Sequence, residues 1–445
     1  MKTKNLNYIV RGIIASILMI LLCYVYRVML DIKNENNRLE QIYANIEEGT
    51  YANIVNYYIY GTHLNFNGYI AKEVLQNDIV QKARVIIRDK NGVRDEIPAV
   101  LNEENDRYNF SLSSNINEGI NLEELIDDDY YVVFLKLSCT DSKGKYKEKI
   151  YLLKNLSSNL TNEYYTITKN GRNNKIDIIF NEENKSIQIK SKETKLPDNV
   201  YDFVIDAGHG GSDTGAQYHE YNEKDFTLDY SISLKIKLEN EGFKVKLTRE
   251  NDVRTPSYGK NSRSETPFET KAKLILSIHL NSSDYDENDG GVEIYSPNHA
   301  NLEFAKSLAD NIVTSVGTGY SINSYKRILD GVYVRTFNQE EIDNFRNETI
   351  SDGYSFYETI TTDTNYLFMI RETGGKITGA YMDGRDQYGS LNHYYNSNIS
   401  AEGYLLELGF INSSKEIERF KNKKDEYLDA ICKSILEDFI QKNEM

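Results

Sequence analysis

Residues 200–211, VYDFVIDAGHGG, decide the fold of the C-terminal half of this 445-residue chain. An apolar run that ends in glycines is typical of a strand followed by a tight turn, because glycine tolerates the positive φ angles of such turns. His209 lies in this turn, and open α/β sheets bind ligands at this carboxyl edge of their strands. Further strand-like runs at 243–249 and 274–281 alternate with helix-like segments. The pattern predicts an α/β domain over residues 199–445, with a mixed, largely parallel sheet flanked by helices.

Composition excludes several classes of protein. The formal net charge is −16, whereas a nucleic-acid-binding protein normally carries a basic surface. The three cysteines, Cys23, Cys139 and Cys432, are too few and too scattered for a disulfide framework or a thiolate zinc site. A chain with 40% hydrophobic residues is not wholly disordered. We therefore expect folded domains and no nucleic-acid partner.

The N-terminus carries an uncharged run at residues 12–26, GIIASILMILLCYVY, between Arg11 and Arg27. The run is shorter than the roughly 20 residues that span a bilayer, but flanking arginines can snorkel and extend it. A signal peptide has a similar layout, yet no small-x-small cleavage site follows. We expect residues 1–30 to be a cytoplasmic tip and a transmembrane helix. The protein would then be a single-pass protein of the cell membrane, with an extracytoplasmic catalytic domain.

Two regions separate this run from the catalytic domain. Residues 31–50 are polar and predict a short stalk. Residues 51–198 contain short runs rich in Tyr, Ile and Val, separated by turn residues, which predicts an all-β, sandwich-like domain. Its role is either that of a spacer or that of a module whose Tyr-rich face binds the cell wall or a partner. The sequence does not separate the two.

The segment at residues 226–238 gives two conflicting signals. Apolar and polar residues alternate with a period of two, which is typical of a strand. The length of the run, and Gly242 as a helix C-cap, favour a helix instead. We predict a helix that is partly buried on both sides.

Four polar residues interrupt apolar segments of the predicted α/β domain. His209 and His279 lie at strand ends, Glu407 lies within the apolar run 403–410, and Glu223 opens the predicted helix. A lone carboxylate in such a strand is costly to bury without a cation. Two imidazoles and one carboxylate make a zinc site with one open position, and a second carboxylate can act as general base. The residue types alone do not decide which glutamate is the ligand.

An alternative for the glycine-rich stretch 208–215, GHGGSDTG, is a loop that cradles a phosphate. It lacks both the lysine of a Walker-type loop and the spacing of a dinucleotide-binding loop. The metal interpretation therefore explains more of the residues.

Residues 202–441 resemble the zinc-dependent N-acetylmuramoyl-L-alanine amidases of the Amidase_3 type, which are cell-wall hydrolases. The resemblance implies that His209, Glu223 and His279 bind one zinc ion and that Glu407 is the catalytic base or acid. The blocks that match, in order, are VIDAGHGG (204–211) with DTGA (213–216), EKD (223–225), LTR (247–249) with Asp252, SIHLN (277–281) with GVEIY (291–295), and LLELGFIN (405–412).

His219 and Glu220 lie near the second block but fit it less well than Glu223 does. The resemblance implies a peptidoglycan hydrolase that cleaves the amide between the lactyl group of N-acetylmuramic acid and the L-alanine of the stem peptide. Glu407 would take a proton from the zinc-held water and return it to the leaving amine. Two alternatives stay open: a catalytically silent or gated wall-binding or scaffold protein, and a zinc peptidase that cuts stem-peptide bonds.

The chain departs from compact members of this family between His279 and Glu407. Residues 337–363 and 375–400 are predicted insertions, expected as ordered surface loops that add glycan contacts or only elaborate the surface. The alternative is that 338–349, the helix-like candidate, blocks the site until a partner, here unidentified, removes it. At the C-terminus, Ser413 and Glu416 form a capping box before a helix that packs on the sheet, and Cys432 is expected in its core.

Overall fold

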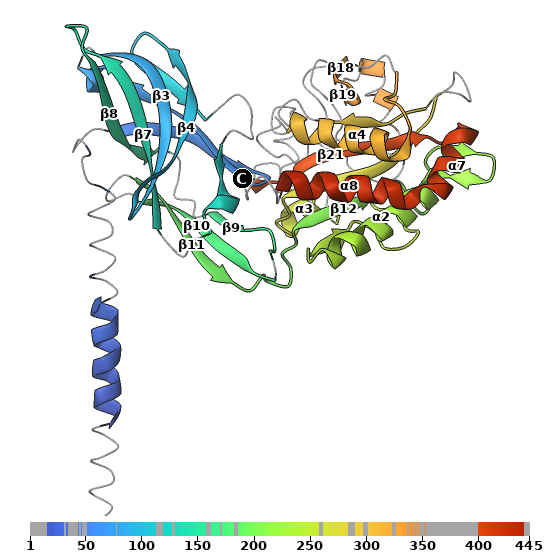
Figure 1. Cartoon of the computed structure of the whole chain (residues 1–445), viewed down its shortest axis with the longest axis horizontal. Helices are drawn as coiled ribbons and strands as arrows, with labels where there is room; N and C mark the ends of the chain where they lie inside the picture. Colours follow the sequence, from blue (N-terminus) through green and yellow to red (C-terminus); the bar gives the residue numbers. More distant parts are fainter. Residues whose placement is uncertain are drawn as a thin grey trace, which may run out of the picture.

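The computed structural model of the chain has two domains side by side, an N-terminal barrel and a C-terminal domain built from a sheet and helices (Figure 1). The structure describes residues 16–30, 33, 43, 46, 51–76, 78–112, 119–126, 130–156, 162–169, 171–181, 186–257, 261–283, 290–296, 301–322, 326–335, 338–340, 343, 344, 347, 351 and 399–439. Most of the predicted stalk and of the two predicted insertions lies outside the described residues.

Seven strands of the N-terminal half close into a barrel in the order β1-β2-β5-β4-β3-β7-β8, with β8 returning to β1. The β1–β8 pair is parallel and the other six pairs are antiparallel. The barrel interior is apolar. The strands are β1 Tyr51–Tyr60, β2 His63–Ala71, β3 Ile79–Asp89, β4 Gly92–Glu103, β5 Arg107–Ser111, β7 Tyr130–Thr140 and β8 Tyr146–Asn155.

The predicted fold class is wrong for this region, because a closed barrel replaces the expected sandwich. A sandwich and a barrel bury one side of every strand, so the alternation of apolar residues is the same in both. The pairing that closes the barrel joins residue 51 to residue 152. No local pattern in the sequence encodes a contact at that separation.

The predicted transmembrane anchor is also not supported. Residues 16–30 form a helix with exposed apolar side chains. Within the described part of the chain, no helix combines the length and the apolar character needed to cross a membrane.

A smaller sheet extends from the barrel toward the C-terminal domain. Strand β11 pairs with the first residues of β7, and β10 and β9 follow outward. Three short elements, η1, β6 and η3, lie between strands of the barrel along the chain. The bounds are β6 Ile120–Asn121, η1 Lys72–Leu75, η3 Leu122–Glu124, β9 Asn162–Tyr165, β10 Asn173–Asn181 and β11 Ser186–Thr194.

The C-terminal domain is built on a seven-stranded mixed sheet in the order β15-β12-β16-β21-β17-β19-β18. Strands β15, β12, β16 and β21 run parallel, whereas β17 is antiparallel to β21 and β18 to β19. The strands are β12 Phe203–Ala207, β15 Val245–Leu247, β16 Leu274–Asn281, β17 Glu293–Tyr295, β18 Lys326–Leu329, β19 Val332–Val334 and β21 Glu402–Phe410.

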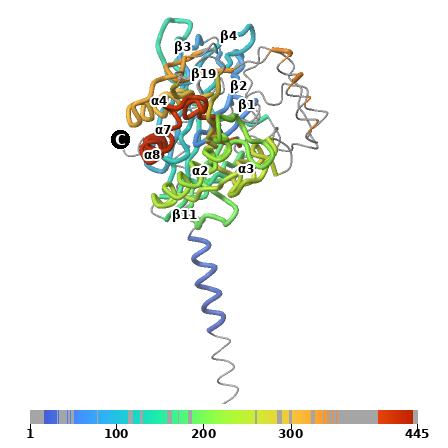
Figure 2. The backbone as a smooth tube through the Cα atoms, turned by 90° about the vertical axis from the view of Figure 1, so that its right-hand side faces the viewer, coloured from blue at the N-terminus to red at the C-terminus, as the bar shows by residue number. Residues whose placement is uncertain are grey.

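Helices α2, α4 and α8 pack together with the strands of this sheet, and Figure 2 shows α4 and α8 side by side. Their apolar residues and those of the central strands form one core. The three packed helices are α2 Glu223–Asn240, α4 Leu302–Val316 and α8 Lys424–Phe439. The remaining elements are β13 Gln217–Tyr218, β14 Tyr221–Asn222, α3 Thr266–Glu269, β20 Ile399–Ser400 and α7 Ser414–Asn422. The limits 51–198 and 199–445 stay predictions.

One local prediction is confirmed and another is confirmed in part. The segment with the period-two pattern is the helix α2, whose buried residues Thr227, Tyr230, Leu234 and Leu238 recur at helical spacing. At the C-terminus, the Ser413 hydroxyl accepts a hydrogen bond from the Glu416 amide at 3.4 Å and caps α7, but the Ser413 amide donates to the Phe410 carbonyl at 3.2 Å, so the capping box is not complete. Length and cap therefore predicted α2 better than the alternation did.

Candidate metal and catalytic site

His209 lies in the glycine turn after β12, with a positive φ of 58°. Its Nδ1 is 2.9 Å from Asp213 Oδ1, and its Nε2 is 3.0 Å from Glu223 Oε2. Burial disfavours the charged imidazole, but hydrogen bonds and charge from Asp213 and Glu223 outweigh it and raise the pKa of His209 to about 10. A histidine held by a carboxylate through one ring nitrogen presents the other to a metal in many metalloproteins.

Glu223 is the first residue of α2 and lies between the two imidazoles. Its Oε1 is 3.0 Å from His279 Nδ1 and accepts the Leu280 amide at 2.9 Å, while Oε2 accepts the Ala216 amide at 2.9 Å. Burial would raise the pKa of Glu223, but the hydrogen bonds and charges of the two histidines lower it well below its usual value. The helix N-terminus also favours a negative charge here.

His279 lies near the end of β16 and faces the glycine turn. The His209 and His279 rings are 4.8 Å apart between centroids. Two glycines leave room for this packing: a Cβ on Gly208 would come within 2.5 Å of the His279 ring, and one on Gly215 within 2.6 Å of Glu223 Oε2. Both contacts are too short for any residue but glycine.

Glu407 lies on β21, directly beside His279 on β16 and beside Glu293 on β17. Its Oε2 atom is buried and has no hydrogen-bond partner within the described residues. Burial, and then the negative charges of Glu223 and Glu293, raise the pKa of Glu407 well above its usual value. A carboxylate with one buried oxygen that lacks a partner within the described residues therefore borders the His-Glu-His cluster.

The cluster fits a zinc ion. One ligand atom each from His209, Glu223 and His279 lie within 4.8 Å of one another. Two zinc ligands at about 2.0–2.1 Å and a tetrahedral angle are about 3.3 Å apart, close to the two 3.0 Å nitrogen–oxygen separations at Glu223. The donor types are those that zinc prefers, and the described structure places no fourth protein ligand among them.

Two buried arginines hold the glycine turn from beneath. Arg249 donates to the carbonyls of Ala207 at 3.0 Å and Gly208 at 2.9 Å. Arg263 donates to the carbonyl of His209 and pairs with Asp206. These donors satisfy carbonyls that the tight turn leaves without strand partners.

The structure brings together all four residues predicted for the site, and it separates the alternatives. His219 and Glu220 are exposed at the tip of the β13–β14 hairpin. Sequence reasoning overlooked Asp213 and Glu293 as single residues. Glu293 carried the same signal as Glu407, a carboxylate inside an apolar strand, and Asp213 follows His209 by four residues within the glycine turn.

Comparisons with known proteins bear on this domain. A family model described as N-acetylmuramoyl-L-alanine amidase, Amidase_3, matches residues 203–341. The part of the chain that belongs to this amidase family by this match is residues 203–341. Amidase_3 is a family of peptidoglycan amidases in which zinc dependence is general. Glu407 of the amidase domain lies outside the matched residues, so its assignment rests on the geometry.

Relatives with curated names match parts of the amidase domain. The germination-specific N-acetylmuramoyl-L-alanine amidase of Bacillus subtilis is 30% identical over 133 residues, 27% of this chain and 56% of that protein. The probable cell wall amidase LytH of Staphylococcus epidermidis is 36% identical over 96 residues, 21% of this chain and 30% of that protein. The matches therefore span less than two thirds of these relatives. Among solved structures, the N-acetylmuramoyl-L-alanine amidase of Clostridium difficile 630 has a TM-score of 0.35 at 20% identity, covering 54% of this chain and 96% of that chain.

Proposed function

We propose that the protein is a zinc-dependent N-acetylmuramoyl-L-alanine amidase that separates stem peptides from the glycan strands of peptidoglycan. The scissile bond is the amide between the lactyl group of N-acetylmuramic acid and L-alanine. One observation carries the proposal: Glu407, whose buried Oε2 has no hydrogen-bond partner within the described residues, borders a cluster of two histidines and a glutamate with zinc-like spacing. The family match supports the substrate class.

His209, Glu223 and His279 would hold the zinc ion. When bound, zinc supplies Lewis-acid polarisation of the scissile carbonyl and of the attacking water. Asp213 keeps the His209 ring oriented through Nδ1. The backbone amides of Ala216 and Leu280 fix both oxygens of Glu223, so the donors are preorganised.

Glu407 acts as general base and then as general acid. Burial and two neighbouring carboxylates disfavour its charged form, which makes it a stronger proton acceptor than a solvated glutamate. The carboxylate takes the proton of the attacking water as the carbon–oxygen bond forms. It then delivers that proton to the nitrogen of L-alanine as the amide bond breaks.

We further propose that the amidase domain works outside the cytoplasm, because its substrate lies there. Support comes from the family match alone, and secretion of the domain would be checked by protease accessibility in intact cells.

The test is digestion of purified peptidoglycan by the full-length protein, loaded with zinc and then treated with a chelator. Products are identified by mass spectrometry. We expect free stem peptides that begin with L-alanine, intact glycan strands, and no release after chelation.

Two other results would contradict the proposal. Cuts within the stem peptide would show a zinc peptidase. Binding to peptidoglycan without any release, by a protein with full zinc occupancy, would show a silent wall-binding protein.

A further inference from the structure

Three adjacent strands of the amidase domain carry a charged residue at one end and a site residue at the other. Asp202 precedes β12, Lys273 precedes β16, and Glu402 is the first residue of β21. All three are almost fully buried, with exposed fractions of 0%, 1% and 1%. His209, His279 and Glu407 lie toward the opposite ends of these strands, in that order.

The three charged residues are in register with one another. The Lys273 amide donates to the Asp202 carbonyl at 3.0 Å, and the Glu402 amide donates to the Lys273 carbonyl at 2.8 Å. They therefore form a row across the N-terminal edge of the parallel strands. Ligands of such sheets gather at the other edge, so this row has no place in the reaction itself.

The N-terminal barrel and its extension cover this row. The Thr168 amide and hydroxyl donate to Asp202 Oδ1 at 3.0 and 3.2 Å. Strand β20, which leads into β21, pairs in parallel with β1, and the Gly61 amide donates to the Ser400 carbonyl at 2.9 Å. A Cβ on Gly61 would come within 2.4 Å of Glu402 Oε1, so the barrel approaches this strand end closely.

Lys273 is the middle residue of the row that the barrel and its extension cover. Its Nζ lies 5.2 Å from the centre of the Tyr164 ring and has no hydrogen-bond partner within the described residues. Glu123 is 2% exposed and accepts hydrogen bonds from the Tyr164 hydroxyl at 2.5 Å and the Ile167 amide at 3.0 Å. The carboxylates of Asp202 and then of Glu123 interact electrostatically with Lys273. An isolated buried ammonium is costly, so the barrel adds through Glu123 to the stabilising charge that Asp202 provides.

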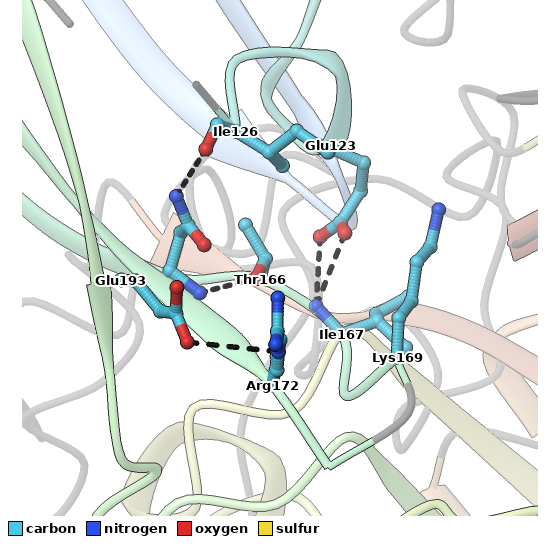
Figure 3. A pocket seen from close by; sticks show the side chains of 8 residues that line it. Glu123, Ile126, Thr166, Ile167, Lys169, Arg172 and Glu193 are labelled. Carbon is cyan, nitrogen blue, oxygen red and sulfur yellow. Dashed lines mark hydrogen bonds and ion pairs between the residues drawn. The ribbon is translucent and has the colours of Figure 1, made fainter. Parts of the chain in front are cut away.

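Figure 3 shows the barrel side of this contact, where both carboxylate oxygens of Glu123 point to the Ile167 amide. A pocket of about 560 Å³ borders Glu123, with Lys169 and Arg172 at its other walls. Open space beside Glu123 allows its neighbours to relax after a substitution. Glu123→Gln is therefore a milder change than the loss of Lys273, which is enclosed.

We propose that the barrel is a positioning element for the metal site, and that it acts through Glu123 and Lys273 to hold the strand that presents His279. The inference rests on the proposed zinc site. Lys273 and His279 are six residues apart on a continuous strand, about 20 Å at about 3.3 Å per residue. A slip of one residue in this strand would turn His279 to the other face of the sheet. The barrel is then a part of the catalytic unit, and not a spacer.

The test compares full-length variants with one another. Lys273→Met removes the buried cation and keeps most of the side-chain volume. Glu123→Gln removes the facing charge and keeps the shape. Lys271→Met is the matched control, because Lys271 also contacts the extension of the barrel, at Glu163 and over the Tyr165 ring, but from the surface.

Zinc affinity is measured by chelator competition at 25 °C, under conditions where circular dichroism shows each variant folded. We expect Lys273→Met to weaken zinc binding tenfold or more, and Lys271→Met to change it less than twofold. The double variant Lys273→Met/Glu123→Gln should bind zinc more tightly than Lys273→Met, since Glu123 then no longer carries a buried charge that faces the missing cation. If Lys273→Met does not fold, Glu123→Gln decides, with weakening of threefold or more expected.

A purely structural role predicts a different pattern. Lys273→Met would then melt at a lower temperature yet bind zinc with unchanged affinity when folded, and this result would overturn the inference. If Lys273→Met does not fold and Glu123→Gln decides, a loss of zinc affinity smaller than threefold in Glu123→Gln would also overturn the inference. A wild-type protein that binds zinc but releases no stem peptide would contradict the proposed reaction and leave the positioning role standing.

Discussion

At the scale of single residues, glycines shape the site as much as the ligands do. Gly208 and Gly215 contact the His279 ring and the Glu223 carboxylate so closely that no Cβ fits. Gly215 also has a φ of +65°, which other residues adopt only with strain. The two glycines thus allow the three side chains that are proposed to bind zinc to meet in a small volume.

Gly215→Ala should weaken zinc binding at least tenfold, because the new Cβ would lie 2.6 Å from both Glu223 Oε2 and His209 Cδ2. Gly144→Ala is the control: its φ is +79° and a Cβ would meet no atom within 4 Å. Both variants carry the same kind of backbone strain, of about 1–2 kcal/mol. Isothermal titration with zinc makes the comparison, and equal affinities in the two variants would show that Gly215 matters only for stability.

The site residues were predictable where a polar side chain broke an apolar pattern. His209, His279 and Glu407 each did so at or within a strand, and the structure places them together. Asp213 broke no pattern, because a polar residue is ordinary in a turn. Its hydrogen bond to His209 depends on the path of the glycine turn, which the residue types alone do not fix.

At the scale of elements, β12 depends on a buried ion pair beneath the glycine turn. Asp206 is fully buried and Arg263 is 5% exposed. Asp206 also accepts hydrogen bonds from the Thr248 and Ser277 hydroxyls. Thr248 directly follows β15 and Ser277 lies on β16, the two strands that run parallel to β12 on either side. The pair therefore links β12 to both of its neighbours at the level where His209 begins its turn.

Asp206→Asn should destabilise the folded protein by about 3–5 kcal/mol at pH 7, because Arg263 would keep a buried charge without its partner. Burial would raise the pKa of Asp206, but Arg263 and the two hydroxyls lower it below its usual value. Its contribution is therefore complete above the unfolded pKa of about 3.9 and is lost as the pH falls through the lower folded pKa. The difference between wild type and variant should shrink accordingly in acid.

Urea unfolding of wild type and variant at several pH values measures this difference. Glu239→Gln is the control, because the Lys235–Glu239 pair on α2 is partly exposed, and such pairs contribute about 0.3–0.5 kcal/mol. A loss below about 1 kcal/mol for Asp206→Asn, or a loss that does not depend on pH, would contradict the assignment.

At the scale of the whole molecule, the strand content of the N-terminal region could be predicted from the sequence, but the closure of its strands into a barrel could not. Strand-like runs over residues 51–198 were visible, but the parallel β1–β8 pair that turns them into a barrel was not. The row of Asp202, Lys273 and Glu402 was equally hidden. Each of these residues is an ordinary polar residue at a strand start until the barrel is seen to cover it.

The central claim is that Glu407 performs the proton transfers beside a zinc ion held by His209, Glu223 and His279. The most direct measurement is the rate of stem-peptide release by zinc-loaded Glu407→Gln, relative to the wild type. The variant keeps the shape of the side chain and removes its basicity, and general acid–base catalysis typically contributes about 10²- to 10⁴-fold. We predict full zinc occupancy with a rate reduced within that range. A near-normal rate at full zinc occupancy would contradict the account.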